Sequence, residues 1–319
     1  MCRMSLLVAK QGYSLDNSDI ENQFKHVKRM ALGNNTIPFK YGHFTDSTEY
    51  DLEAKLIHED GFGYYFHSAS GNVIKKYTEP VFSLNENNII NNIPYDVDTS
   101  FMHSRLATEG SKNISNVQPL NHGNIVGMHN GSVSGIAQGD ESDSKYIMRV
   151  IDNYFNSNDS VNGLEQELIE HIVKPSESYS SMNLILHAKN TNKIFVLCSY
   201  DSAKVKSIQH AQYYKMMIAI DDSKIYVSSE SDLGEVISSG KKTFTKNNTL
   251  YVIDVDTGEV KEYYMRDLEQ AIAEKNSENL KEKDKVKNSR LEEQSARESE
   301  DGEEEADHNL EGNSFKEAA

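Results

Sequence analysis

Residue 2 of this 319-residue chain is a cysteine that directly follows the initiator methionine. A small second residue generally allows Met1 to be removed, which leaves the Cys2 thiol beside a free α-amine. The amine titrates near ~8 and the thiol near ~8.5, so the two groups can exchange a proton at neutral pH. Cys2 is therefore a candidate nucleophile that carries its own base. A cysteine at a frayed terminus can also be incidental, so the hypothesis needs further residues.

Charged groups that suit the two ends of an amino acid follow later in the chain. Arg105, in FMHSRLATEG, can bind a carboxylate through two parallel hydrogen bonds, and Thr108 can add a hydroxyl to the same group. Asp143, in SDSK, can bind an ammonium group. Taken singly, Arg105 is also compatible with a surface position, and Asp143 with a helix N-terminus that its charge stabilises.

The segment NVQPLNHGNIVGMHNG contains a pair of hydrogen-bond donors for a developing oxyanion. The Asn130 side-chain amide and the Gly131 backbone N–H can stabilise the tetrahedral intermediate formed by thiolate attack on an amide. Losing one such donor typically costs ~3 kcal/mol of transition-state stabilisation. Asn-Gly is also a common turn dipeptide, and we expect these residues to form a turn. His103 and His129 lack metal-site spacing, so we expect them to support the site rather than to bind a metal.

Together these segments resemble the class II glutamine amidotransferases, a branch of the N-terminal-nucleophile hydrolases that begin with the nucleophilic cysteine. In that family an H-x-R-x-A-T-like strand holds the arginine for the substrate carboxylate, an H-N-G turn supplies the oxyanion hole, and an S-D segment supplies the aspartate for the ammonium. The stretches SSE at 228–230 and NNTLYVID at 247–254 also resemble late strands of stand-alone members. The resemblance covers roughly residues 2–260.

This resemblance implies a glutaminase reaction at the side-chain amide of L-glutamine, with Cys2, Asn130 and Gly131 catalytic and Arg105, Thr108, Gly131 and Asp143 binding the substrate. It implies no cofactor and no metal. Glu109 stands where several family members have histidine, and Gln118 stands where the motif often reads N-x-H-P. Both departures lie in the loop that we expect beside the pocket for the substrate carboxylate.

The elements that must position these residues are indicated by the pattern of apolar residues. Residues 4–10 predict a buried strand, 16–32 a capped helix, and 60–81 a β-hairpin with its turn at Ser70-Gly71-Asn72. We expect further strands at 98–107, 124–128, 182–189, 193–200, 213–220, 224–230 and 249–255, and helices from Ser142 to Phe155, at 163–174 and at 264–291. Strands, then helices, then strands indicate an α+β fold of two antiparallel sheets with helices packed outside. The resemblance implies the αββα sandwich of the N-terminal-nucleophile hydrolases.

We expect a glutaminase domain at residues 2–265, followed at 266–319 by a charged helix and an acidic disordered tail. The net charge of −17 disfavours nucleic acid as a partner. No apolar run approaches the ~18 residues of a membrane span, and no secretory signal is recognisable, so we expect a cytoplasmic protein. Two distant cysteines do not suggest a disulfide framework, and Cys198 lies in an apolar run typical of a core.

The ammonia acceptor is expected on a separate synthase or ligase subunit, because the chain after Asp267 is too short and polar to form a second site. Two alternatives share part of these features. A related hydrolase could cleave a γ-glutamyl amide in a small metabolite or peptide. A regulatory or structural protein could keep the fold without catalysis, although it has no physical need for the five residues Cys2, Arg105, Asn130, Gly131 and Asp143.

Overall fold

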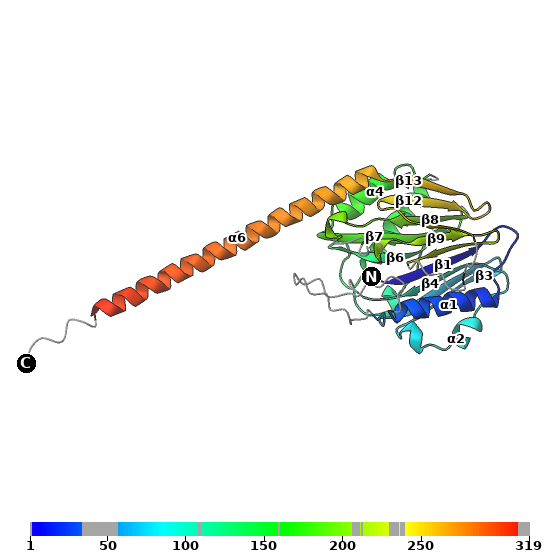
Figure 1. Cartoon of the computed structure of the whole chain (residues 1–319), viewed down its shortest axis with the longest axis horizontal. Coiled ribbons are helices and arrows are strands. Elements are labelled where there is room, and N and C mark those ends of the chain that lie inside the picture. Colours follow the sequence, from blue (N-terminus) through cyan, green and yellow to red (C-terminus); the bar gives the residue numbers. More distant parts are fainter. Residues whose placement is uncertain are drawn as a thin grey trace, which may run out of the picture. The chain divides into compact units, whose positions relative to one another are not determined.

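The computed structural model describes residues 2–33, 57–107, 110–158, 160–205, 211, 213–229, 236 and 240–311, with only the backbone described at 88 and 292–311. The chain divides into two compact units, residues 1–273 and 274–319. The first unit contains two antiparallel sheets (Figure 1).

Sheet A contains seven strands in the order β11, β9, β10, β1, β4, β2, β3. Their bounds are β1 Arg3–Ala9, β2 Phe62–Ser68, β3 Gly71–Tyr77, β4 Val97–Ser104, β9 Met217–Ile220, β10 Lys224–Ser228 and β11 Lys241–Phe244. Strand β1 lies between β10 and β4, so the residue that precedes it, Cys2, reaches the sheet at a central position.

Sheet B contains six strands in the order β13, β12, β8, β7, β6, β5. Their bounds are β5 Leu120–His122, β6 Ile125–Ser134, β7 Ser178–Ala188, β8 Lys193–Cys198, β12 Thr249–Asp254 and β13 Val260–Tyr264. The helical segments of the chain are α1 Asn17–Ala31, η1 Val81–Ser83, α2 Asn87–Ile90, η2 Ile114–Asn116, α3 Asp143–Ser157, α4 Leu164–Leu168, η3 Ile169–Val173, η4 Ser202–Lys204 and α6 Arg266–Glu311.

Three apolar clusters hold these layers together. One fills the space between the sheets and includes Leu6 and Phe101 of sheet A and Ile185 and Val196 of sheet B. A second joins sheet A to α1, and a third joins sheet B to α3, α4 and the first turns of α6. Figure 1 shows the sheets stacked with α1 and α2 on one side and α4 on the other. The predicted α+β arrangement of two antiparallel sheets between helical layers is confirmed.

Helix α1 shows how the local sequence sets an element. Asp16 caps it: the Asp19 N–H donates to Asp16 Oδ1 at 2.8 Å, and the Asp16 N–H donates to Asp19 Oδ2 at 3.1 Å. This reciprocal pair satisfies two backbone donors that a helix start would otherwise leave open. The apolar stripe predicted from the sequence, represented by Ile20, Phe24 and Val27, is buried against sheet A.

Three expectations differ from the structure. The strand expected at 124–128 is β6, which continues to Ser134 and contains the residues expected in a turn. Strands β5, β11 and β13, all at sheet edges, were not predicted. β5 has only three residues, and KKTF in β11 and VKEYY in β13 are mostly exposed, because one row of an edge strand's backbone and much of its side-chain surface face water. Helix α6 continues twenty residues beyond Leu291, through a stretch expected to be disordered. That stretch contains eight glutamates, and glutamate has a high helix propensity.

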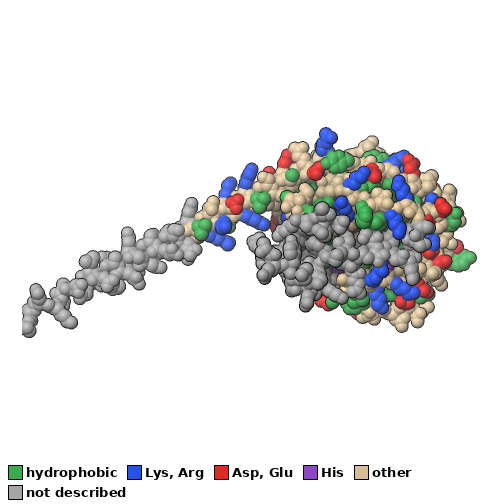
Figure 2. Space-filling model, viewed as in Figure 1, with side chains coloured by type: hydrophobic (Ala, Val, Ile, Leu, Met, Phe, Trp, Pro, Cys, Tyr) green, Lys and Arg blue, Asp and Glu red, His purple; other side chains and the backbone are tan. Residues whose placement is uncertain are grey.

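Figure 2 shows acidic and basic side chains interspersed over the face of the first unit that it presents. Such mixing is typical of a solvated surface. Within the described ranges, no helix has both the length and the apolar character needed to cross a membrane.

Candidate active site

Cys2 lies at the N-terminal end of β1, almost fully buried at 8% exposure. Its Sγ lies 3.4 Å from the backbone N of Leu106, which donates to it, and 3.5 Å from the Leu106 carbonyl oxygen. Burial raises the pKa of the Cys2 thiol. The positive N-terminus, the Leu106 N–H and the Arg105 charge act to lower that pKa, and the Asp143 charge acts to raise it. Arg105 and Leu106, about 100 positions away, and Asp143, about 140 positions away, thus all influence the pKa of the Cys2 thiol.

The segment that holds the sulfur, residues 105–107, is fixed by the start of the hairpin. Asp60 N donates to the Arg105 carbonyl at 3.1 Å, and Arg105 N donates to the Gly61 carbonyl at 2.8 Å. The buried Asp60 carboxylate also accepts a hydrogen bond from Ala107 N at 2.8 Å and pairs with Lys112 at 2.6 Å. Arg105 itself is buried, and its Nη1 donates to the Ser111 carbonyl at 3.1 Å. Asp60 and Leu106 were not identified from the sequence.

Asn130 lies on the surface of sheet B that faces sheet A. Side chains alternate along a strand. Met4 lies in the core between the sheets, which places Cys2, two residues earlier, on the same face; Met128 lies in that core too, which places Asn130 there. The Asn130 side chain is buried, and its Oδ1 has no hydrogen-bond partner among the described residues. This unused oxygen can accept a hydrogen bond from a donor on a ligand, whereas an oxyanion would need the Nδ2 donor of the same amide.

Gly131 lies inside β6 and not in a turn, so the predicted turn is wrong. It is opposite Met182 of β7. A Cβ at this position would lie 1.9 Å from the Ser181 carbonyl oxygen and 2.8 Å from His129 Nε2. Glycine is required because the two strands approach closely, which is a different reason from the turn that the Asn-Gly pair suggested.

Asp143 is the first residue of α3, and its buried carboxylate connects that helix to β6. Val133 N donates to Asp143 Oδ2 at 3.0 Å, and Ser144 N and Ser144 Oγ donate to Oδ1 at 2.7 and 3.3 Å. His129 Nδ1 lies 3.8 Å from Oδ2. A carboxylate has about four acceptor positions, so three hydrogen bonds leave capacity for a further donor.

Gln118, which departs from the family motif, connects the same elements. Its side-chain oxygen Oε1 accepts a hydrogen bond from His129 N at 2.6 Å. Its side-chain nitrogen Nε2 donates to the His129 carbonyl and to Ser144 Oγ, each at 3.1 Å. This buried amide therefore pairs with the β6 backbone next to Asn130 as a neighbouring strand would. No local pattern of residues indicates this role beyond the mismatch itself.

The two histidines are buried and neutral. Burial, aided by the Arg105 charge, lowers the pKa of His103 to about 3. Burial also lowers the pKa of His129, against the opposing effect of Asp143. His129 Nδ1 lies 3.0 Å from Ser144 Oγ, so it belongs to the Gln118 and Asp143 network. The part of the chain that is described contains no group of three or more His, Cys, Asp or Glu arranged to hold a metal ion.

Thr108 and Glu109 lie outside the described residues. Cys198 is buried in the core between the sheets, as its apolar context predicted. Burial raises the pKa of its thiol to about 12. The described candidates thus occur at the start of β1, after the end of β4, on β6 and at the start of α3, with Arg105 and Asp143 both acting on Cys2.

Comparison with known proteins gives matches among solved structures alone: no family profile and no curated protein matches the chain. One similar structure is a glutamine phosphoribosylpyrophosphate amidotransferase from B. subtilis in complex with ADP and GMP, with 12% identity and a TM-score of 0.45. Another, described as the allosteric regulatory enzyme of purine biosynthesis, has 12% identity and a TM-score of 0.46. Each match covers 83% of this chain and 49% of the solved chain, so the chain spans about half the length of these two proteins.

A third similar structure is a glutamine aminotransferase class-II domain protein from Silicibacter pomeroyi, with 12% identity and a TM-score of 0.44. This match covers 82% of this chain and 99% of the other.

Proposed function

We propose that this protein is a class II glutamine amidotransferase that hydrolyses the side-chain amide of L-glutamine through a thioester on Cys2. The observation that carries the proposal is the environment of the Cys2 thiol, which is held by the Leu106 backbone and acted on by the charges of Arg105 and Asp143. A nucleophile beside one cation and one anion suits a zwitterionic substrate that has an amide at its far end.

In the proposed binding mode, Arg105 pairs with the substrate carboxylate, to which Thr108 adds a hydroxyl. Asp143 accepts a hydrogen bond from the substrate ammonium through its remaining acceptor capacity. The amide carbon then lies at the Cys2 sulfur, in the space between the sheets that Asn130 faces. The Asn130 amide and the Gly131 N–H stabilise the oxyanion.

The proposed reaction has two stages. With Met1 removed, the Cys2 amine takes the thiol proton, the thiolate attacks the amide carbon, and the C–N bond breaks as the ammonium returns a proton to the leaving ammonia. Water then attacks the thioester, giving glutamate and restoring the thiol. Neutral His103 and His129 take no part in these proton transfers, because burial holds their pKa values low.

We further propose that residues 2–265 form the glutaminase domain, and that the ammonia is used by a separate synthase or ligase subunit in the cytoplasm. Residues 274–319, the second compact unit, are a charged segment that is available for docking to that subunit. Affinity purification of the full chain and of a chain ending at Ala273 tests this part. Recovery of no synthase with either chain would contradict it.

The test of the reaction compares Cys2→Ala with Cys198→Ala, because Cys198 is the other cysteine and lies in the core. Glutamate release from glutamine should fall more than about a thousandfold in Cys2→Ala and should persist in Cys198→Ala. Intact mass should show that Met1 is absent, and diazo-oxo-norleucine should label Cys2. Equal glutamate release by both variants would reject the proposal, as would a retained Met1.

A further inference from the structure

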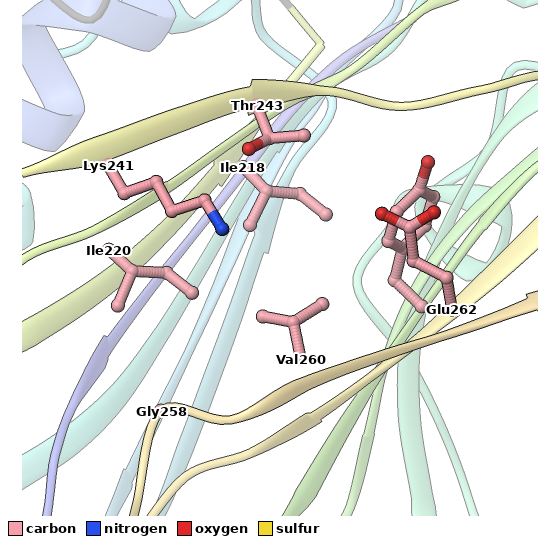
Figure 3. A pocket seen from close by; sticks show the side chains of 8 residues that line it. Ile218, Ile220, Lys241, Thr243, Gly258, Val260 and Glu262 are labelled. Atoms are coloured by element: carbon pink, nitrogen blue, oxygen red, sulfur yellow. The ribbon is translucent and has the colours of Figure 1, made fainter.

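A cavity of about 220 Å³ opens between the two sheets at the edge formed by β11 and β13. Sheet A contributes Ile218, Ile220 and Thr243, and sheet B contributes Tyr251 and Val260. Figure 3 shows Ile218, Ile220 and Thr243 facing Val260, with the amine of Lys241 directed toward Ile218 and Val260. The cavity is therefore a continuation of the core between the sheets that side chains do not fill.

The residues that line the cavity differ in length, and Gly258 contributes no side chain to it. Facing sheets lie about 10 Å apart, a distance that large apolar side chains normally fill. Here one wall contains Gly258, where a Cβ would lie 3.2 Å from the Lys10 amine and 3.5 Å from Ile220. Lys241, opposite Ile220, and Glu262, opposite Tyr251, are longer but end in charged groups at the rim.

The charges at the rim favour an anion. Lys241 has no ion pair or hydrogen bond with any other described residue. The Glu262 carboxylate, by contrast, is paired with Lys246. The Lys10 amine, which donates to the Asp221 carbonyl at 3.3 Å, lies beside the Gly258 wall. The Lys241 charge thus has no counter-charge among the described residues, and the Lys10 amine adds a positive charge that meets only a carbonyl oxygen.

We propose that this cavity binds a small carboxylate with an aliphatic body, whose chain enters between Ile218 and Val260 and whose carboxylate pairs with Lys241. A dry cavity of 150 Å³ holds benzene, so this volume accommodates about nine non-hydrogen atoms. Hexanoate, which has a six-carbon chain and one carboxylate, is the matching probe. Burial of the hexanoate carbon chain among apolar side chains favours binding. The Lys241 charge favours the carboxylate over an alcohol of equal length.

The cavity is separate from the Cys2 site. Ile220 pairs with Ile225, and Ile225 pairs with Val8. Val8 is six residues from Cys2 on an extended strand, a separation of roughly 20 Å along β1. The proposal does not depend on the glutaminase function, so Cys2→Ala should bind hexanoate with native affinity.

Binding is tested by calorimetric titration of the full-length protein with hexanoate and with 1-hexanol. Hexanoate should bind saturably, and 1-hexanol at least about tenfold more weakly. Lys241→Gln should weaken hexanoate binding at least about tenfold and remove the preference over 1-hexanol. Val260→Phe should fill the cavity and weaken both ligands, with thermal unfolding used to verify that the variant folds.

Lys242→Gln is the matched control, because Lys242 is opposite Ala219 and so faces the other side of β11. It should keep native affinity. Absence of saturable hexanoate binding by the native protein would overturn the proposal. Equal affinities in native protein, Lys241→Gln and Lys242→Gln would also overturn it. Displacement of hexanoate by glutamine would do the same, because it would place the ligand at the Cys2 site.

Discussion

The Asp143 carboxylate connects helix α3 to strand β6, and it is also proposed to bind the substrate. Three of its roughly four acceptor positions are used by Val133 and Ser144. The carboxylate is therefore held in one orientation before a ligand arrives. Such preorganisation lowers the cost of ordering the site on binding.

We expect Asp143→Asn to raise the KM for glutamine at least about tenfold, because the amide keeps an acceptor for Val133 but loses the charge that pairs with the substrate ammonium. The change in kcat should be smaller. Steady-state kinetics with glutamine measure both values, and thermal unfolding reports any loss of stability.

Asp152→Asn provides the control for this prediction. Asp152 is another buried aspartate of α3 and accepts hydrogen bonds from Asn124 N at 2.8 Å and from Asn156 at 3.0 Å. The Asp152→Asn variant should be less stable than the native protein, and its KM for glutamine should be unchanged. A KM that is unchanged in Asp143→Asn, or that rises equally in both variants, would count against a substrate contact at Asp143.

At the scale of elements, Gln118 joins β6 to the start of α3. Its side chain meets the backbone N–H and carbonyl of His129, and it also donates to Ser144. Asn130 and Gly131 follow His129 directly, so Gln118 is a positioning residue for the proposed oxyanion donors. It does not itself reach the reacting atoms in this role.

We expect Gln118→Glu to lower kcat about tenfold with little change in KM, because the lost Nε2 donor and the added charge displace the β6 backbone beside the oxyanion donors. A merely structural role would lower the melting temperature while leaving the turnover of the folded fraction unchanged. Kinetics normalised by active-site labelling separate the two cases.

The exposed Gln138→Glu makes the same chemical change away from the site, and it should be neutral. If turnover per labelled site in Gln118→Glu equals that of the native protein, Gln118 does not position the donors.

At the scale of the whole molecule, acidification should destabilise the fold through His103. Burial lowers its pKa to about 3, below the ordinary value of 6.5. Between these two pH values the imidazole is protonated in the unfolded chain and neutral in the folded chain. The stabilisation is therefore fully present above pH 6.5 and is lost as the pH falls toward 3. Between pH 6.5 and 4.5 this single group should reduce the free energy of unfolding by about 2 kcal/mol.

Urea unfolding at the two pH values measures that loss. The loss of free energy of unfolding between the two pH values should be smaller in His103→Leu, which has no titrating ring. It should be unchanged in His122→Gln. His122 is the control because its side chain is 42% exposed. An identical pH dependence in native protein and His103→Leu would contradict this assignment.

The two compact units predict where the chain can be shortened. The first unit ends at Ala273, and Leu268 and Ile272 of α6 are buried against sheet B. A chain ending at Ala273 should therefore keep the melting temperature and the glutaminase activity of the full chain. A chain ending at Met265 exposes the surface that these two side chains cover and should lose about 2–5 kcal/mol of stability. Thermal unfolding of both chains decides this, and equal stability would refute it.

Features that depend on neighbours a few positions apart can be predicted from the residue pattern. The capping pair of α1, the apolar stripe of α3 and the β2–β3 hairpin follow from spacing within one element. The alternation of strands and helices also indicated the layered architecture. The candidate residues Cys2, Arg105, Asn130, Gly131, Thr108 and Asp143 came from motif order, and their roles stay predictions.

Contacts between segments that are distant along the chain are visible only in the folded protein. Leu106 meets the Cys2 sulfur across 104 positions, and Gln118 pairs with His129 although no local pattern indicates it. The Asn-Gly pair looked like a turn because its neighbours in the chain permit one. Pairing with Met182 of β7 places Gly131 in a strand instead, and the close approach of the Ser181 carbonyl requires a glycine there. Strands at the sheet edges and the cavity beside them likewise follow from pairing and packing, which a linear pattern of residue types does not record.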